Sequence, residues 1–208
     1  MADAGLLIDR VRRRLAEPLP GREAQIRMAP QPRQWPPDTA VLRPAAALLL
    51  IYPHAGEWWI PLTVRGASLR HHGGQVSLPG GRLDHPDETI ERAALREARE
   101  EIGVVARGVE ILGRLTPLPI AVSGHLLCPV VAAVPTRPVF AIAADEVDRL
   151  IEVTVNGLLH PDAVGWERRE SSRQPGLVMD VPYFEVEGHR VWGATAMVLS
   201  EFIALLAG

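Results

Sequence analysis

The expected fold is decided by Gly80-Gly81-Arg82-Leu83-Asp84-His85-Pro86-Asp87-Glu88, which soon leads into Arg96-Glu97-Ala98-Arg99-Glu100-Glu101-Ile102-Gly103-Val104. The spacing of apolar residues predicts a helix from about Glu88 to Ile102. A glycine-containing loop therefore precedes a helix that is rich in carboxylates. Its apolar face, which can pack on a sheet, is formed by Leu95, Ala98 and Ile102.

Three glutamates of this helix share one face. Glu97 and Glu101 lie about 40° apart in projection, and Glu100 lies about 60° to the other side of Glu97. Like charges at this spacing repel each other, so at least one pKa should exceed the usual value of about 4.3. Hard divalent cations bind such carboxylates. A solvated acidic face is the alternative, neutralised by Arg92, Arg96 and Arg99.

The segment ending in residues 96–104 resembles the Nudix box, the loop-helix signature of Nudix hydrolases. The family's usual spacing has five residues between a glycine and a glutamate, and seven more before the Arg-Glu pair. Here one residue is inserted. Counting from Gly81 reaches Asp87, whereas counting back from Arg96 reaches Glu88, so the first acid stays open between these two residues.

A second motif lies upstream and consists of Leu62-Thr63-Val64-Arg65-Gly66-Ala67-Ser68-Leu69-Arg70-His71-His72-Gly73-Gly74-Gln75-Val76-Ser77-Leu78-Pro79-Gly80-Gly81. It resembles the motif that precedes the box in the coenzyme A pyrophosphatase branch of the family. Gly66 departs from the Ser or Ala that is usual there. With the segment Val191–Ala196, which is also similar to that branch, the resemblance covers about residues 42–205.

The resemblance implies an α/β fold, a Nudix-type α/β/α sandwich with a mixed sheet and a loop-helix metal site. It also implies metal-dependent hydrolysis with Mg²⁺ or Mn²⁺ of coenzyme A or acyl-CoA to 3′,5′-ADP and (acyl-)phosphopantetheine. Carried over by position, the metal ligands are Glu97, Glu101, Glu100 and the Gly80 carbonyl. Glu100 is alternatively the base, and Arg96 orients a glutamate.

Other residues of the expected site lie outside the box. Glu146 stands at the late acidic position from which many Nudix enzymes draw a further ligand or base. Arg65 and Arg70 suit phosphate, because a guanidinium group offers two parallel donors to phosphate oxygens. They are alternatively surface charges beside a hairpin. His72 and its neighbour His71 are substrate-binding candidates or solvated loop residues.

Composition limits the function classes. The 208 residues are 47% hydrophobic and 23% charged, which is typical of a folded globular chain. A net charge of −3 argues against a nucleic-acid partner, although all 22 basic residues are arginines. We find no secretory signal and no run of about 18 apolar residues, so we expect a cytoplasmic protein without a membrane partner. Cys128 is interpreted as a small buried residue.

The chain is expected to divide at residue 40. Residues 1–40 should form an N-terminal helix over 4–16 and a Pro-rich extended arm, which begins at residue 17 and continues to 44. Residues 41–208 should form the Nudix hydrolase domain. Its strands are predicted, in chain order, at 45–52, 58–64, 109–116, 126–134 and 151–155, before a final helix at 194–206.

Two other functions remain open from sequence alone. One is a Nudix pyrophosphatase for another diphosphate, such as ADP-ribose or a dinucleotide like NADH. The other is a catalytically silent binding module of the same fold, which would have no need of three repelling glutamates. The expected partner is a small-molecule diphosphate substrate, and a homodimer is compatible with the sequence.

Overall fold

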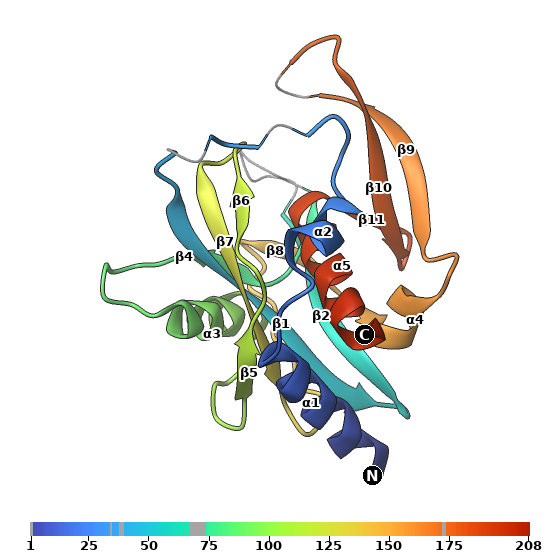
Figure 1. The fold of residues 1–208 in the computed structure, drawn as a ribbon. Helices are drawn as coiled ribbons and strands as arrows, with labels where there is room; N and C mark the ends of the chain where they lie inside the picture. Colours follow the sequence, from blue (N-terminus) through green and yellow to red (C-terminus); the bar gives the residue numbers. More distant parts are fainter. Residues whose placement is uncertain (1, 34, 38–39, 67–73, 172–173) are drawn as a thin grey trace.

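The computed structural model describes the chain except residues 1, 34, 38–39, 67–73 and 172–173. Its helices are α1 (Ala2–Leu15), α2 (Gly21–Ile26), α3 (Ile90–Ile102), α4 (Val155–Leu159) and α5 (Gly193–Ala207). Its strands are β1 (Arg43–His54), β2 (Glu57–Arg65), β3 (Val76–Ser77), β4 (Gly80–Arg82), β5 (Glu110–Arg114), β6 (Leu118–Ile120), β7 (His125–Ala133), β8 (Val147–Thr154), β9 (Val164–Glu170), β10 (Val178–Val186) and β11 (His189–Trp192). The expected mixed α/β architecture is confirmed (Figure 1).

The larger sheet is mixed and has eight strands among the residues that the structure describes. Its main path runs β3-β2-β1-β7-β5, while β4 pairs with β1, β6 with β7 and β8 with β2. β1 and β7 are parallel, with Ala45 opposite Leu127, and β4 lies antiparallel to β1. The apolar runs at 45–52 and 126–134 thus become neighbouring central strands, as their continuous hydrophobicity favours.

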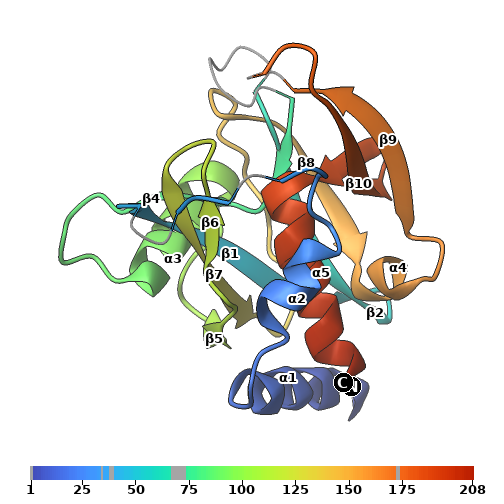
Figure 2. The ribbon, with the colours of Figure 1, turned by 45° about the horizontal axis from the view of Figure 1, so that its top comes forward.

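Strand β1 is buried on both of its faces. Successive side chains of a strand point to opposite sides, so the run 45–52 serves two cores. Ala46, Leu48 and Leu50 pack with the apolar residues of α3. Ala47, Leu49 and Ile51 pack in the other core with α5. The two helices therefore cover opposite faces of the sheet, which is the expected sandwich (Figures 1 and 2).

A second sheet, of three strands in the order β11-β10-β9, precedes α5 and was not predicted. Along β9, the first of these strands in the sequence, residues alternate between exposed and partly buried; Trp166 and Arg168 are among the exposed ones. Such a strand lacks an apolar run, so hydrophobicity alone does not reveal it. Thr195, just inside α5, donates its hydroxyl to the Val76 carbonyl at 3.0 Å and ties this part of the chain to β3.

The N-terminal helix is confirmed, but the expectation of an extended arm is wrong for residues 21–26, which form α2. α1 and α2 both lie against α5 (Figure 2). Gln25 is buried and donates to the carboxylate of Glu201 at 2.8 Å, and Ser200 donates to the Ala24 carbonyl at 2.7 Å. These polar contacts with a distant helix cannot be read from a proline-rich composition.

The remaining differences concern β8 and the shortest elements. The strand expected at 151–155 is longer and begins at Val147, whereas the short elements β3, β4, β6 and α4 were not predicted. Cys128 is buried, as expected. Among the described residues, no helix is long and apolar enough to cross a membrane.

Candidate active site

The helix α3 is capped at both ends by its own sequence. Thr89 accepts a hydrogen bond from the Arg92 amide at 3.3 Å, which caps the N-terminus. Gly103 ends the helix with φ of +73°, a left-handed conformation that glycine adopts without strain. The observed helix begins at Ile90, two residues later than expected, and Glu88 lies outside it. The caps set the two ends of the helix, and the packing of its apolar residues against β1 fixes the direction in which the three glutamates point.

Two glycines allow β4 to run between β1 and α3. Gly80 lies opposite Ala47 on β1, and a side chain there would overlap the Ala46 carbonyl and come within 2.7 Å of the Ala47 Cα. A side chain on Gly81 would instead overlap the carboxylate of Glu97. The loop can therefore approach both the sheet and the acidic helix face only because both residues are glycines.

Arg96 is the centre of the hydrogen bonds among the acids. Its Nε donates to Glu88 at 3.0 Å, and its Nη1 donates to Glu97 at 2.9 Å and to Glu100 at 3.1 Å. Its Nη2 donates to the Arg82 carbonyl at 2.7 Å. One guanidinium group thus joins the loop to the helix and neutralises part of the acidic face.

The same contacts favour Glu88 over Asp87 as the first acid of the box. Glu88 is only 12% exposed at its side chain, and besides Arg96 it accepts the Asp84 amide at 2.8 Å. The hydrogen bond from Arg96 lowers the pKa of Glu88, so this carboxylate is held ionised. Asp84 Oδ2 also lies 3.2 Å from Arg96 Nε, a contact that the sequence does not predict, since no helical spacing links Asp84 to the cluster.

Glu101 is the most buried of the three glutamates. Its side chain is 4% exposed, and its Oε2 atom is buried without a hydrogen-bond partner among the described residues. Burial raises its pKa to about 7, with Glu97 and Glu146 adding repulsion and Arg65 opposing the shift. The pKa of Glu97 is raised as well, again mainly by burial. The direction expected from sequence is observed, but burial contributes more than repulsion.

Two further predicted residues lie beside this cluster. Arg65, at the end of β2, places its Nη1 atom 3.8 Å from Glu101 Oε1. Glu146, in the loop before β8, lies close enough to raise the pKa of both Glu97 and Glu101. Its backbone carbonyl accepts the Gly66 amide at 3.0 Å, which links this loop to the residue after Arg65. Arg70, His71 and His72 lie outside the described residues.

The acids suit a hard cation, although no cation site is fully assembled. Carboxylate oxygens are preferred ligands of such ions, and Glu101 Oε2 is a buried acceptor without a partner in the described chain. Across the described ranges, however, no three His, Cys, Asp or Glu side chains already gather around one point. Arg96 holds one oxygen each of Glu97 and Glu100, so their second oxygens are the ones that can turn to an ion.

Comparison with known proteins agrees with this architecture. Residues 41–173 match the family model described as the NUDIX domain. The chain is 35% identical over 176 residues to the uncharacterized Nudix hydrolase NudL of Citrobacter koseri, covering 82% of this chain and 86% of that protein. NudL of Salmonella paratyphi B is 36% identical over 178 residues, with the same coverages. The solved MutT protein from Methanosarcina mazei Go1 shares the fold, with a TM-score of 0.52, 16% identity and coverage of 81% and 97%.

Proposed function

The chain belongs to the Nudix family, and from this premise we propose that it hydrolyses coenzyme A or an acyl-CoA to 3′,5′-ADP and (acyl-)phosphopantetheine. Nudix hydrolases act on small-molecule diphosphates and generally need divalent metal ions. In the proposed reaction, the oxygen of one water molecule forms a bond to one phosphorus while the bridging P–O bond breaks. The leaving phosphate monoester keeps the bridging oxygen, one proton of the water goes to a carboxylate, and the other stays on the new phosphate monoester until that group ionises.

The observation that carries hydrolysis is the buried Oε2 of Glu101, which has no hydrogen-bond partner in the described part of the chain and lies beside two further glutamates. Glu97, Glu101, Glu100 and the Gly80 carbonyl would hold Mg²⁺ or Mn²⁺. When bound, such an ion neutralises charge on the diphosphate oxygens and lowers the pKa of water. Glu100 is half exposed and Glu146 is exposed, so either can reach a water molecule as the base.

The choice of coenzyme A is supported by the motif at residues 62–81. The structure adds that Arg65, from this motif, lies next to Glu101. Its side chain is 30% exposed, so its guanidinium group can donate hydrogen bonds to diphosphate oxygens when Glu101 binds an ion. We assign Arg70 and His72 to substrate binding on the motif alone.

The role of Arg96 can be tested separately from its charge. Arg96→Lys keeps one positive charge but cannot donate to Glu88, Glu97 and the Arg82 carbonyl together. We expect turnover to fall about tenfold to a hundredfold, with a smaller change in KM, because the lysine leaves the glutamates less well placed. Unchanged turnover at limiting Mg²⁺ would contradict a positioning role.

A direct assay tests the proposed reaction. The purified chain is incubated with coenzyme A, ADP-ribose or NADH, each with Mg²⁺, with Mn²⁺ or with a chelator, and products are identified by mass. We expect the highest kcat/KM for coenzyme A, with 3′,5′-ADP as a product and no reaction with the chelator. A higher kcat/KM for ADP-ribose or NADH would overturn coenzyme A as the substrate. If none of the three diphosphates is hydrolysed, the chain is a binding module.

A further inference from the structure

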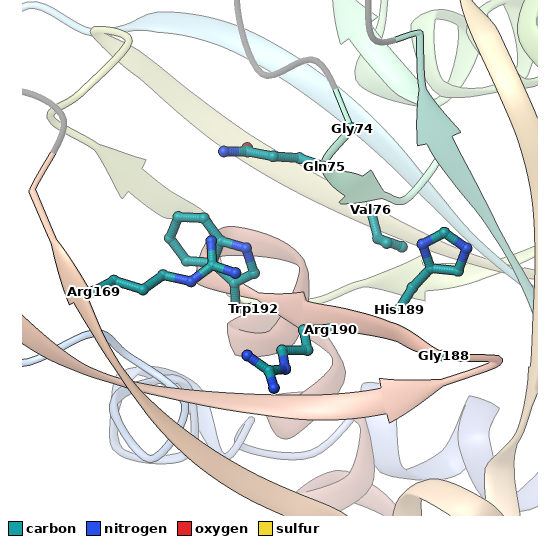
Figure 3. A pocket seen from close by; sticks show the side chains of 8 residues that line it. All are labelled: Gly74, Gln75, Val76, Arg169, Gly188, His189, Arg190 and Trp192. Atoms are coloured by element: carbon teal, nitrogen blue, oxygen red, sulfur yellow. The ribbon is translucent and has the colours of Figure 1, made fainter.

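A cavity of about 510 Å³ lies apart from the acidic cluster, between β3 and the three-stranded sheet. Gly74, Gln75 and Val76 form one wall (Figure 3). The opposite wall comes from β9, the β10–β11 turn and β11, with the side chains of Arg169, His189, Arg190 and Trp192. This volume is within the range of small-molecule sites, and the Nudix box contributes none of the described lining residues.

The cavity is electropositive. Arg169 Nε and Arg190 Nη1 both contact the carboxylate of Glu167, one to each oxygen. Two guanidinium groups therefore share one carboxylate, and none of the described lining residues is acidic. Glu167 is 13% exposed, so it holds both arginines in place from behind while Arg190 stays 50% exposed. A group with more than one negative charge would complete this arrangement.

The cavity also offers a flat aromatic surface. The guanidinium carbon of Arg169 lies 4.6 Å from the ring centroid of Trp192, over its face. Planar bases stack on indole rings and on guanidinium planes alike. Trp192 directly precedes α5, whose Thr195 donates its hydroxyl to the carbonyl of the lining residue Val76. The aromatic surface and the β3 wall are thus joined by a buried contact.

The backbone links this cavity to the acidic cluster. The Gly74 amide donates to the Arg65 carbonyl at 2.9 Å, and the Arg65 amide donates to the Gln75 carbonyl at 3.0 Å. The cavity wall and Arg65 are therefore neighbouring strand partners, while the Arg65 side chain lies beside Glu101. Arg65 therefore connects the two places, the cavity wall through its backbone and the acidic cluster through its side chain.

We propose that this cavity is the subsite for the phosphorylated nucleoside end of the substrate, and this inference rests on the proposed function. The base stacks against the Arg169–Trp192 pair. The ribose 3′-phosphate binds the guanidinium groups of Arg190 and Arg169, with His189 at its edge. A nucleoside without that phosphate keeps the stacking but loses the ionic contacts, so the subsite distinguishes 3′,5′-ADP from 5′-AMP.

The test measures binding without hydrolysis. Isothermal titration of the chain with 3′,5′-ADP and with 5′-AMP, in chelator, gives the ratio of the two dissociation constants. We expect the unmodified chain to prefer 3′,5′-ADP by about tenfold or more, as charged hydrogen bonds allow. Arg190→Gln and Arg169→Gln should reduce that ratio to near one, and Trp192→Leu should weaken both ligands together.

Arg168→Gln is the matched control. Arg168 is the neighbour of Arg169 in the sequence, but its side chain points to the other face of β9 and is 79% exposed. Its Nε lies 3.9 Å from the Asp180 carboxylate. The control should keep the preference. Arg190→Lys guards against misfolding, because it keeps the charge and should retain part of the preference. If the ratio of the dissociation constants for 5′-AMP and 3′,5′-ADP is the same in the unmodified chain, the Arg190 variants and Arg168→Gln, the subsite assignment is overturned.

Failure of this inference is distinguishable from failure of the proposed function. If coenzyme A is hydrolysed but the Arg169 and Arg190 variants keep the preference for 3′,5′-ADP, the subsite assignment is overturned and the reaction stands. If coenzyme A is not hydrolysed, the proposed function is overturned by the assay itself. Loss of the preference in both glutamine variants, together with coenzyme A hydrolysis, supports both.

Discussion

Glu101→Gln is expected to lower diphosphate hydrolysis by about a thousandfold, which corresponds to about 4 kcal/mol of activation free energy. The change removes the negative charge of the most buried acid while it keeps the shape of the side chain. Glu97→Gln should act in the same direction. Initial rates over a range of Mg²⁺ concentrations measure the effect, because a lost ligand also raises the metal concentration needed for half-maximal rate.

Glu91→Gln is the matched control for this prediction. Glu91 lies in the first turn of the same helix but pairs with Arg114, away from the cluster. Its loss should change the rate by no more than about twofold, because the surface ion pair that it forms contributes little to stability. Near-parental activity of Glu101→Gln at limiting metal would contradict its assignment as a ligand.

The same substitution should change how stability depends on pH. The folded-state pKa of Glu101 is raised to about 7, so the native state holds a proton that the unfolded chain has released. The stabilising contribution of the neutral acid is complete below the unfolded pKa of about 4.3 and is lost as pH rises through about 7. Without metal, Glu101→Gln should therefore melt higher than the unmodified chain at pH 8 and nearly equally at pH 5. A constant difference across this range would show that Glu101 is not the titrating group.

Gly80→Ala and Gly81→Ala are expected to separate stability from activity. At Gly80 the added methyl group meets the backbone of β1, which cannot turn aside, so we expect a loss of about 2 to 4 kcal/mol of unfolding free energy. At Gly81 it meets the carboxylate of Glu97, which can rotate. We expect that variant to remain folded but to lose activity about a hundredfold, because Glu97 is moved.

Thermal melts and initial rates of the two variants are the measurement. Gly80→Ala and Gly81→Ala each add one methyl group at neighbouring positions, so each variant is the control for the other. A Gly80→Ala chain that melts like the unmodified one would contradict the close approach of β4 to β1. A fully active Gly81→Ala chain would show that the position of Glu97 is not needed for hydrolysis.

Several elements could be predicted because their signals are local. The helix ending at Ile102 combines an apolar face with a glycine after its last turn, and the strands at 45–52 and 126–134 are continuous apolar runs. The sharing of one helix face by Glu97, Glu100 and Glu101 follows from helical geometry alone. Strand β9 was missed because charged residues interrupt its apolar pattern. Helix α2 was missed because it is only six residues long and its anchoring contacts, from Gln25 and Ala24 to α5, are with a distant segment.

The sequence by itself determined the family, the fold class and the identity of the acidic cluster, because motif spacing and helical periodicity depend only on neighbours along the chain. Only the tertiary structure decided between Asp87 and Glu88, since that choice depends on which carboxylate reaches Arg96. It also decided that Glu101 is buried beside Arg65, and that Arg169 and Trp192 line one cavity with Gln75. Burial and long-range pairing arise only when separate segments exclude water together, and no local pattern encodes them.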